Sequence, residues 1–162
     1  RNWEAEALKA QDLGVRVVVT RFGVVLGRDG GALSQMTPLF KKFLGGPIGS
    51  GTQWFSWIHQ ADLARAFRFI QENPQISGPV NLTAPNPVRN RELARALGRV
   101  LHRPSFMPTP EFMLRLALGE VAGTLLTGQK VLPQRLLDAG FSFKFATIEA
   151  ALADLLGQGA KE

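Results

Sequence analysis

VRVVVTRFGVVLG, residues 15–27, is the stretch of the sequence that decides the fold. Four of its first five residues are valine, and such a nearly continuous β-branched run is typical of a strand covered on both faces, as in parallel sheets. Residues 1–11, RNWEAEALKAQ, have the composition of a helix that ends at Gly14. A helix leading into a covered strand is half of a βαβ crossover. We therefore expect an α/β fold with a parallel sheet, in which the first strand of this crossover precedes Arg1.

Turn residues and hydrophobic periodicity divide the rest of the chain into short elements. Up to residue 101 they predict a helix over 33–44 that packs through Met36, Leu39, Phe40 and Phe43, a strand over 53–58, a helix over 63–73 with Asp62 as N-cap, a strand over 80–83, and a helix over 91–101 with Asn90 as N-cap. Beyond Thr109 they predict helices from Pro110, over 119–127 and over 133–139, a half-exposed strand over 141–145, and a last helix capped by Thr147. Short strands and helices therefore alternate along the whole chain.

The glycine-rich stretch GGPIGSGTQWFSWIH, residues 45–59, poses a separate question, because such runs often hold phosphate. A phosphate loop would read G-x-x-x-x-G-K-[ST], or G-x-G-x-x-G between a strand and a helix. Here Gly49 and Gly51 precede a predicted strand, and no lysine follows them. We interpret these glycines as turn residues.

The composition limits the classes of protein and of site. A chain of 162 residues can form one ordinary domain, and the absence of cysteine excludes disulfides and thiolate metal sites. The two histidines, His59 and His102, are far apart in the sequence, so we expect no metal. No apolar run is long enough for a membrane span and no signal-peptide pattern opens the chain, which predicts a cytoplasmic protein.

The net charge of +6 raises the question of nucleic acid. The basic residues concentrate in one predicted helix and its flanks, at Arg89, Arg91, Arg95, Arg99 and Arg103. No helix-turn-helix or RNA-binding signature accompanies them, and we interpret them as a solvated helix face. The chain also contains no tyrosine, so a mechanism that needs a tyrosine acid cannot be completed within it.

Several segments in the right order resemble the C-terminal half of the extended short-chain dehydrogenase/reductase superfamily. The matching pieces are RNWEAEA, TRFGVVLGRDGGAL, GGPIGSGTQWFSWIHQADLARA, GPVNLTAPNPVRNRELARAL and LGEVAGTLLTGQKVLPQRLLDAGFSFKFATIEAAL. They are similar above all to the NAD(P)-dependent, epimerase-like family that is also labelled cell-division-inhibitor-related. The last piece resembles the small C-terminal domain of this family.

The resemblance implies the C-terminal portion of a Rossmann-type fold, with its last parallel strands, its substrate-side segments and a small, mainly helical C-terminal domain. We expect the Rossmann-like part to cover residues 1–108 and the small domain residues 109–158. The family's dinucleotide loop and its Tyr-x-x-x-Lys pair would lie before Arg1. We therefore expect a fragment: the substrate-side half of an NAD(P)-dependent nucleotide-sugar epimerase or oxidoreductase, inactive alone. The alternatives are a non-catalytic NADP(H)-binding or regulatory module and a complete, unfamiliar domain.

The resemblance also places a cofactor beside the end of the valine strand. It implies that Thr20, Arg21, Phe22 and Gly23 line that end, with Gly23 allowing close approach of the backbone. The alternative for Arg21 is a structural ion pair. The cofactor would be NADP or NAD in the intact parent, and we expect none to bind this chain alone.

The strand QWFSWIH resembles the segment that closes the substrate cleft. Its candidate substrate-binding residues are Gln53, Ser56, Trp57 and His59. The alternatives are that Trp57 belongs to the core and that His59 anchors the helix start near Asp62. Gln129, Lys130 and Arg135 are weaker candidates for an anionic ligand. As partners we expect a small molecule, such as a nucleotide sugar or carbonyl compound, and either self-association or the missing N-terminal half, but no membrane or nucleic acid.

Overall fold

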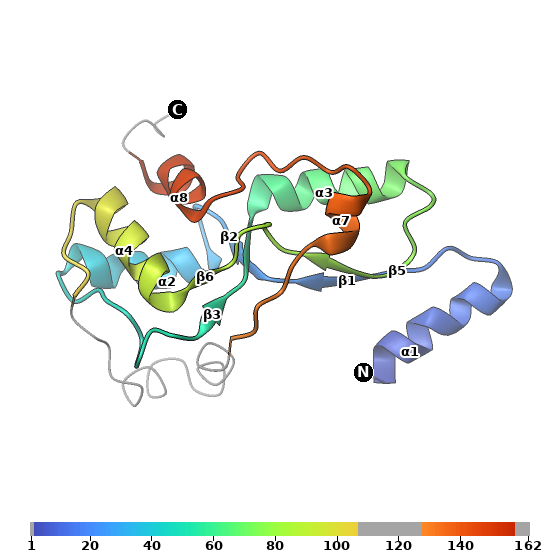
Figure 1. Cartoon of the computed structure of the whole chain (residues 1–162), viewed down its shortest axis with the longest axis horizontal. Coiled ribbons are helices and arrows are strands. Elements are labelled where there is room, and N and C mark those ends of the chain that lie inside the picture. The colour runs from blue at the N-terminus through green and yellow to red at the C-terminus, as the bar shows by residue number, and fades with distance from the viewer. Residues whose placement is uncertain (1, 107–127, 158–162) are drawn as a thin grey trace.

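A computed structural model describes residues 2–106 and 128–157 of the chain (Figure 1). Its strands form three pairs, two parallel and one antiparallel. β1 (Val18–Phe22) pairs in parallel with β5 (Gly78–Leu82), β2 (Val24–Leu26) in parallel with β4 (Trp57–His59), and β3 (Trp54–Phe55) antiparallel with β6 (Val88–Arg89). The parallel α/β arrangement that the valine run predicted is therefore confirmed.

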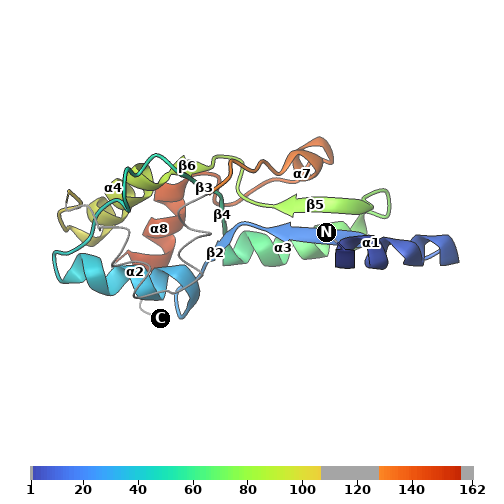
Figure 2. The ribbon, with the colours of Figure 1, turned by 90° about the horizontal axis from the view of Figure 1, so that it is seen from below.

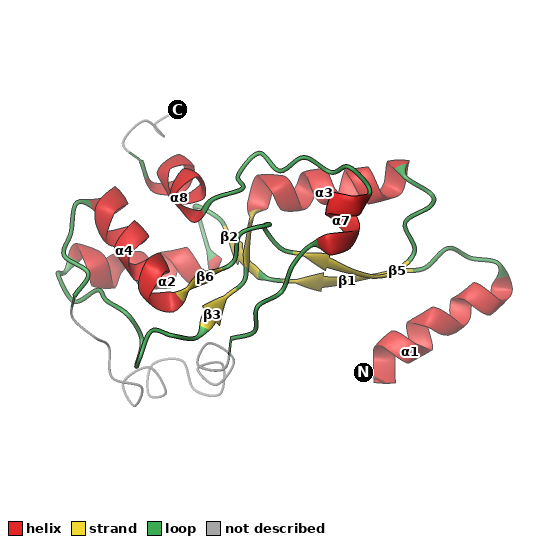
Figure 3. Ribbon diagram, in the orientation of Figure 1, coloured by secondary structure: helices red, strands yellow, loops and turns green. Residues whose placement is uncertain are grey.

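The helices group around these strands (Figure 3). They are α1 (Asn2–Leu8), which continues as the 3-10 turn η1 (Lys9–Leu13), then α2 (Gly31–Lys41), α3 (Gln60–Glu72), α4 (Asn90–Leu101), α7 (Gln134–Asp138) and α8 (Ile148–Leu156). Figures 1 and 2 show α1 at one end of the molecule, α3 alongside the β1–β5 pair, and α2, α4 and α8 together at the other end. The two predicted helices between residues 110 and 127 lie outside the described residues.

Two hydrophobic clusters share strand β4. Trp57 belongs to the cluster that includes Leu97 and Leu152, whereas Ile58 belongs to the one that includes Val80 and Leu136. Because neighbouring strand residues point to opposite faces, both faces of β4 are covered. Each large apolar side chain buried in this way contributes about 1.5–3 kcal/mol. The C-terminal residues contribute to both clusters, Leu152 to the first and Leu136 to the second. The C-terminal segment therefore packs against both parallel strand pairs, β1–β5 and β2–β4.

The two edges of the β1–β5 pair differ. Along the outer side of β5, Asn81 Nδ2 donates to the carbonyl of Leu132 over 3.2 Å, and Arg135 Nη1 donates to the carbonyls of Ser77 and Pro79. Within the described residues, by contrast, β1 pairs with β5 alone. One side of the first valine strand therefore has no neighbouring strand in the part of the chain that the structure describes.

The valine run itself is less covered than its sequence predicted. Val15 is 55% exposed and precedes the strand, which begins at Val18, and Val19 is half-buried. The helix after the glycine turn ends at Lys41 instead of residue 44, and only part of its predicted packing face is buried. Phe40 is buried and Met36 packs on the core, but Leu39 and Phe43 are 43% and 57% exposed.

Three local predictions are wrong, and in each of them a side chain binds backbone groups that are distant in the sequence. Asp62 does not cap α3, because its carboxylate binds backbone N–H groups of the C-terminal segment. Asn90 does not cap α4, because Asn90 Oδ1 accepts from the N–H of Ile48. Residues 141–145 form no strand, and Phe141 and Phe145 are both buried there.

Other local predictions are confirmed. Gly14 closes η1 in the left-handed conformation with φ of 75°, and Thr147 accepts a hydrogen bond from the N–H of Ala150 at the start of α8. No helix within residues 2–106 and 128–157 combines the length and hydropathy that crossing a bilayer requires.

Candidate functional site

The carboxyl ends of β1 and β5 lie side by side, since Phe22 pairs in register with Leu82. Ligands of open parallel sheets bind beyond this edge. Directly after Phe22 the chain passes through Gly23 into β2, which pairs with β4. The candidate site is therefore the point at which the chain leaves one strand pair and joins the other.

Gly23 makes this change of neighbour possible. Its N–H donates to the carbonyl of Leu82 over 3.1 Å, and the next N–H, of Val24, donates to the carbonyl of Ser56 over 2.8 Å. A Cβ atom at Gly23 would lie 2.8 Å from Ser56 O and 3.0 Å from Thr83 Cγ2. The backbone that approaches Gly23 closely is that of Ser56. Whether Gly23 also allows a cofactor to approach stays a prediction.

Residues 129–131 lie across this junction and are fixed by two hydroxyl groups. Ser56 Oγ donates to the carbonyl of Gln129 over 2.7 Å and accepts from the N–H of Val131 over 2.9 Å. Thr83 Oγ1 donates to the carbonyl of Val131 over 3.3 Å. The candidate Ser56 thus fastens the C-terminal segment next to the strand ends.

The other cofactor-side candidates point to different sides of β1. Arg21 forms a two-pronged ion pair with Glu4 of α1, at 2.9 Å and 2.7 Å, and this carboxylate raises the pKa of the Arg21 guanidinium. Phe22, 55% exposed, lies with its ring centroid 5.9 Å from that of Phe67 in α3. Thr20 is half-buried opposite Val80. The ion-pair alternative for Arg21 is what the structure contains, and a cofactor role for these residues stays a prediction.

Two of the substrate-side candidates are occupied by contacts within the chain. Trp57 is completely buried, and its Nε1 donates to the carbonyl of Asn86 over 3.2 Å. Gln53 is partly buried, and its Nε2 donates to the carbonyl of Ile48 over 3.1 Å. Trp57 therefore belongs to the hydrophobic core, as the alternative interpretation of this residue predicted. Whether any of these side chains also meets a substrate stays a prediction.

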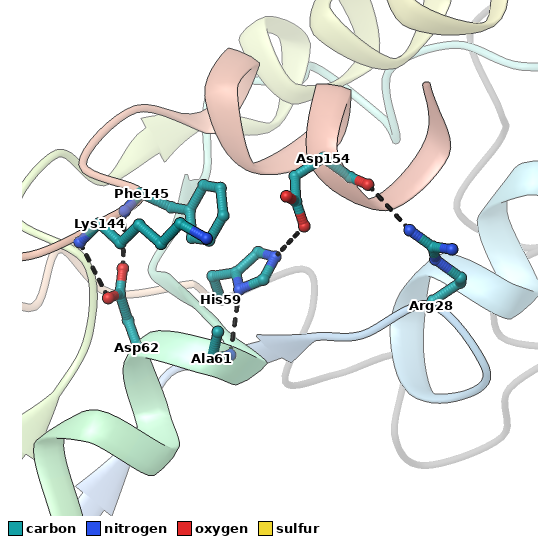
Figure 4. A network of polar contacts seen from close by, with 7 residues as sticks. All are labelled: Arg28, His59, Ala61, Asp62, Lys144, Phe145 and Asp154. Carbon is teal, nitrogen blue, oxygen red and sulfur yellow. Dashed lines mark hydrogen bonds and ion pairs between the residues drawn. The ribbon is translucent and has the colours of Figure 1, made fainter. Parts of the chain in front are cut away.

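His59 is the N-cap of α3 and has an almost completely buried ring (Figure 4). Its Nδ1 accepts from the N–H of Ala61 over 3.0 Å, so the proton of the neutral ring is on Nε2. Nε2 faces Asp154 Oδ2 of α8 at 3.3 Å, although the N–H is not aligned for a hydrogen bond, and the ring stacks on Phe145 with centroids 3.9 Å apart. Burial lowers the pKa of His59, which the carboxylates of Asp154 and Asp62 only partly oppose.

Sequence reasoning missed the neighbouring carboxylate of Asp62, which is completely buried. Asp62 accepts from the N–H groups of Lys144 and Phe145 over 2.9 Å and 2.8 Å (Figure 4). It also accepts from Arg65 Nη1 over 2.6 Å. The sequence analysis assigned Asp62 to the N-cap of its helix and so passed over this contact with a segment distant in the sequence. Asp62 joins the C-terminal segment to α3.

Trp54 is a second residue that the sequence analysis passed over. The guanidinium carbon of Arg89 lies 3.7 Å from the centroid of the half-buried Trp54 ring, and Lys130 Nζ lies 5.0 Å from it. Two cations therefore meet one indole beside residues 129–131. Of the weaker candidates for an anionic ligand, Gln129 and Lys130 lie in the segment across the strand junction, whereas Arg135 binds the backbone near β5.

The chemistry available at the junction is orientation and binding. Ser56 and Thr83 use their hydroxyl groups on backbone partners, and the sequence supplies no tyrosine. Within the described ranges, no three His, Cys, Asp or Glu residues gather as metal ligands would. The space beside Gly23 is filled by Ser56. A ligand site at this junction therefore stays a prediction, and the described residues beside Gly23 form no dinucleotide cradle.

Comparison with known protein families decides the affiliation. Residues 1–82, half of the chain, match the NAD dependent epimerase/dehydratase family. The chain belongs to this family. Residues 109–155 match a further family model, a domain of unknown function (DUF1731). The epimerase family accounts for the α/β, Rossmann-like arrangement of the parallel strands, with helical parts, that the structure contains.

Known relatives extend this result. The chain is 52% identical over 156 residues to the "Epimerase family protein SDR39U1 homolog, chloroplastic" of Arabidopsis thaliana. The aligned region covers 96% of this chain and 45% of that protein. It superposes on the crystal structure of human epimerase family protein SDR39U1 with NADPH at a TM-score of 0.83 and 43% identity, over 88% of this chain and 48% of that one. A nucleoside-diphosphate sugar epimerase from Corynebacterium glutamicum is similar at a TM-score of 0.76 and 35% identity, over 97% and 30%.

The chain thus spans about half the length of the curated relatives that it matches, 45–52% of each.

Proposed function

We propose that this epimerase-family chain is the substrate-side half of an NAD(P)-dependent nucleotide-sugar epimerase or oxidoreductase, incomplete for catalysis on its own. The observation that carries the proposal is the outer side of β1, which has no neighbouring strand among the described residues. The chain is also only about half as long as its relatives. A parallel strand in a Rossmann-type sheet can accept a further strand on such a side. In this proposal the other half of the enzyme supplies that strand.

The cofactor of the intact enzyme is NADP or NAD, and this chain alone binds neither. One relative's structure contains NADPH, which supports a nicotinamide cofactor for the family. No G-x-G-x-x-G occurs anywhere in the sequence, so the phosphates of a dinucleotide lack their usual backbone cradle. When bound, the cofactor would transfer a hydride to or from the substrate.

The substrate is a small molecule, a nucleotide sugar or a carbonyl compound, that meets the strand junction near Gly23 and Ser56. Residues 129–131 close the same junction through Ser56 and Thr83, which makes the C-terminal segment part of the wall of the proposed site. The proposed setting is the cytoplasm, the compartment that the sequence predicted.

Calorimetry with NADPH tests the division into halves. The chain of 162 residues is expected to show no binding at micromolar NADPH, whereas the chain extended at its N-terminus to the length of its relatives is expected to bind it. Micromolar binding by the chain alone would refute the proposal. So would an extended chain that binds NADPH no better.

A non-catalytic NADP(H)-binding or regulatory module is the second candidate, favoured by the absence of tyrosine. The two functions differ in turnover. An extended chain that converts a nucleotide sugar into its epimer, or that changes the absorbance of NADPH in the presence of a carbonyl compound, is an enzyme. One that binds NADPH tightly and turns over neither class is the module.

A further inference from the structure

An open groove of about 770 Å³ lies at the C-terminal end of α4. Arg95, Arg99, His102, Arg103 and Ser105 line it, together with Gly98. This end of α4 lies at the far side of the molecule from α1 (Figures 1 and 2). No carboxylate lines the groove within the part of the chain that the structure describes.

The groove is built by a tight return of the chain onto the helix. A Cβ atom at Gly98 would lie 2.7 Å from the carbonyl oxygen of Arg103 and 2.8 Å from the Cβ of Ser105. His102, with φ of 53°, adopts the left-handed conformation that turns the chain back. Residues 103–105 can therefore form the second wall only because residue 98 has no side chain.

Among the described residues, the guanidinium groups of Arg95 and Arg99 do not cap the C-terminal carbonyls of α4. Two of the last carbonyls of α4 accept backbone N–H groups, since the N–H of His102 donates to Arg99 O over 3.2 Å and that of Arg103 to Gly98 O over 2.8 Å. The helix dipole offsets only about half a charge. Two guanidinium groups, those of Arg95 and Arg99, bind none of these carbonyls in the described structure.

The groove also keeps more cations than anions. Arg99 pairs with Glu149 of α8 at 3.1 Å, and both side chains are more than half exposed. Among the described residues no ion pair involves Arg95 or Arg103. Of the three guanidinium groups, only that of Arg99 has a carboxylate partner among the described residues.

Arg103 is held in place at the wall of the groove. Its Nη1 donates to the carbonyl of His102 over 3.0 Å, and its guanidinium carbon lies 4.9 Å from the centroid of the Phe43 ring. Its Nε is buried and has no hydrogen-bond partner among the described residues. A fixed cation of this kind loses little conformational freedom when an anion binds.

We propose that this groove binds a small molecule that carries a phosphate or diphosphate group, held by Arg95, Arg99 and Arg103. Guanidinium groups match the geometry of phosphate oxygens and form paired hydrogen bonds with them. The volume falls in the range of small-ligand pockets. A single-stranded nucleic acid would require aromatic rings for stacking, and no aromatic side chain apart from His102 lines the groove in the described residues.

Inorganic pyrophosphate at constant ionic strength is the probe, with binding followed by calorimetry and by backbone amide shifts in NMR spectra. We expect saturable binding in the submillimolar range and shifts centred on Gly98, His102 and Ser105. Arg95→Gln and Arg99→Gln should each weaken binding about tenfold or more. Both side chains are exposed, so circular dichroism should show an unchanged fold.

Arg91→Gln is the matched control, since Arg91 is exposed on the same helix, carries the same charge and does not line the groove. It should leave pyrophosphate binding within about twofold of wild type, because distant exposed charges are screened. Absence of saturable binding at millimolar pyrophosphate would overturn the proposal. An equal loss in all three variants would also overturn it, and tighter binding of a short oligonucleotide with such an equal loss would identify a nucleic-acid surface instead.

Discussion

At Gly23 the chain changes its neighbour, and only a residue without a side chain fits there. We expect Gly23→Ala to lower the free energy of unfolding by about 1–3 kcal/mol, because the added methyl group meets the Ser56 carbonyl at 2.8 Å and backbone must move. Urea unfolding measures this loss. Gly27→Ala is the control: its methyl group meets only the end of the exposed Gln60 side chain, which can move away, so the loss should be much smaller.

His59 makes stability depend on pH in a direction that its burial determines. Its pKa is lower in the folded chain than in the unfolded one, where it is about 6.5. Between these two pKa values the unfolded state binds more protons, so stability falls as the pH falls from about 6.5 toward the folded pKa. Urea midpoints measured from pH 7 to pH 5 should therefore decrease.

The variant His59→Asn isolates this contribution, because asparagine keeps an N-cap acceptor for α3 and does not titrate. Its urea midpoint should change less between pH 7 and pH 5 than that of wild type. A pH dependence identical in the two proteins would show that His59 does not contribute it.

Among the elements, the contact between α3 and the C-terminal segment depends on Asp62. Asp62→Asn keeps the size of the side chain but replaces one acceptor oxygen by a donor that faces the N–H of Lys144 or Phe145. We expect a loss of about 2–3 kcal/mol in the free energy of unfolding. Trypsin should also cleave after Lys144 more rapidly in the variant. Asp29→Asn, at an exposed position, should change neither measurement appreciably.

The type of most elements could be predicted from the sequence, whereas their partners could not. Periodicity and caps placed the strand at residues 80–83, the helix at 133–139 and the last helix close to their observed positions. The alternating residues 141–145 looked like a strand, yet the N–H groups of Lys144 and Phe145 bind the carboxylate of Asp62 and not a neighbouring strand. A side chain distant in sequence decided that segment, and local periodicity contains no information about it.

The same limit applied to the candidate site. Gly23 was named because the family resemblance places the end of its strand beside the cofactor, but the sequence could not show that Ser56 would fill the space beside it. The helix of arginines was predicted to be a solvated face, and its exposed Arg91, Arg95 and Arg99 agree with that prediction. The groove beside it depends on the return of residues 103–105 onto Gly98, a tertiary contact that spacing alone does not specify.

For the whole molecule, the distribution of exposed apolar surface predicts self-association. Trp3 and Leu13 are 81% and 82% exposed near the start of the chain. Val15, which precedes β1, and Phe22, its last residue, are each 55% exposed. The same strand has one side without a neighbour in the described residues. Unpaired strand edges with apolar surroundings recruit partners, either a second copy or the missing half of the proposed enzyme.

Sedimentation velocity over a range of concentrations measures this association for the isolated chain. We expect dimers or larger species at tens of micromolar, and Val15→Lys should shift the distribution toward monomer, because a lysine beside a strand edge opposes pairing. Phe106→Lys is the control, since Phe106 is 78% exposed but follows α4 at the other end of the molecule. A wild-type chain that sediments as a stable monomer at every concentration would mean that this apolar end is tolerated in water, and the unpaired side of β1 would then no longer argue for a missing half.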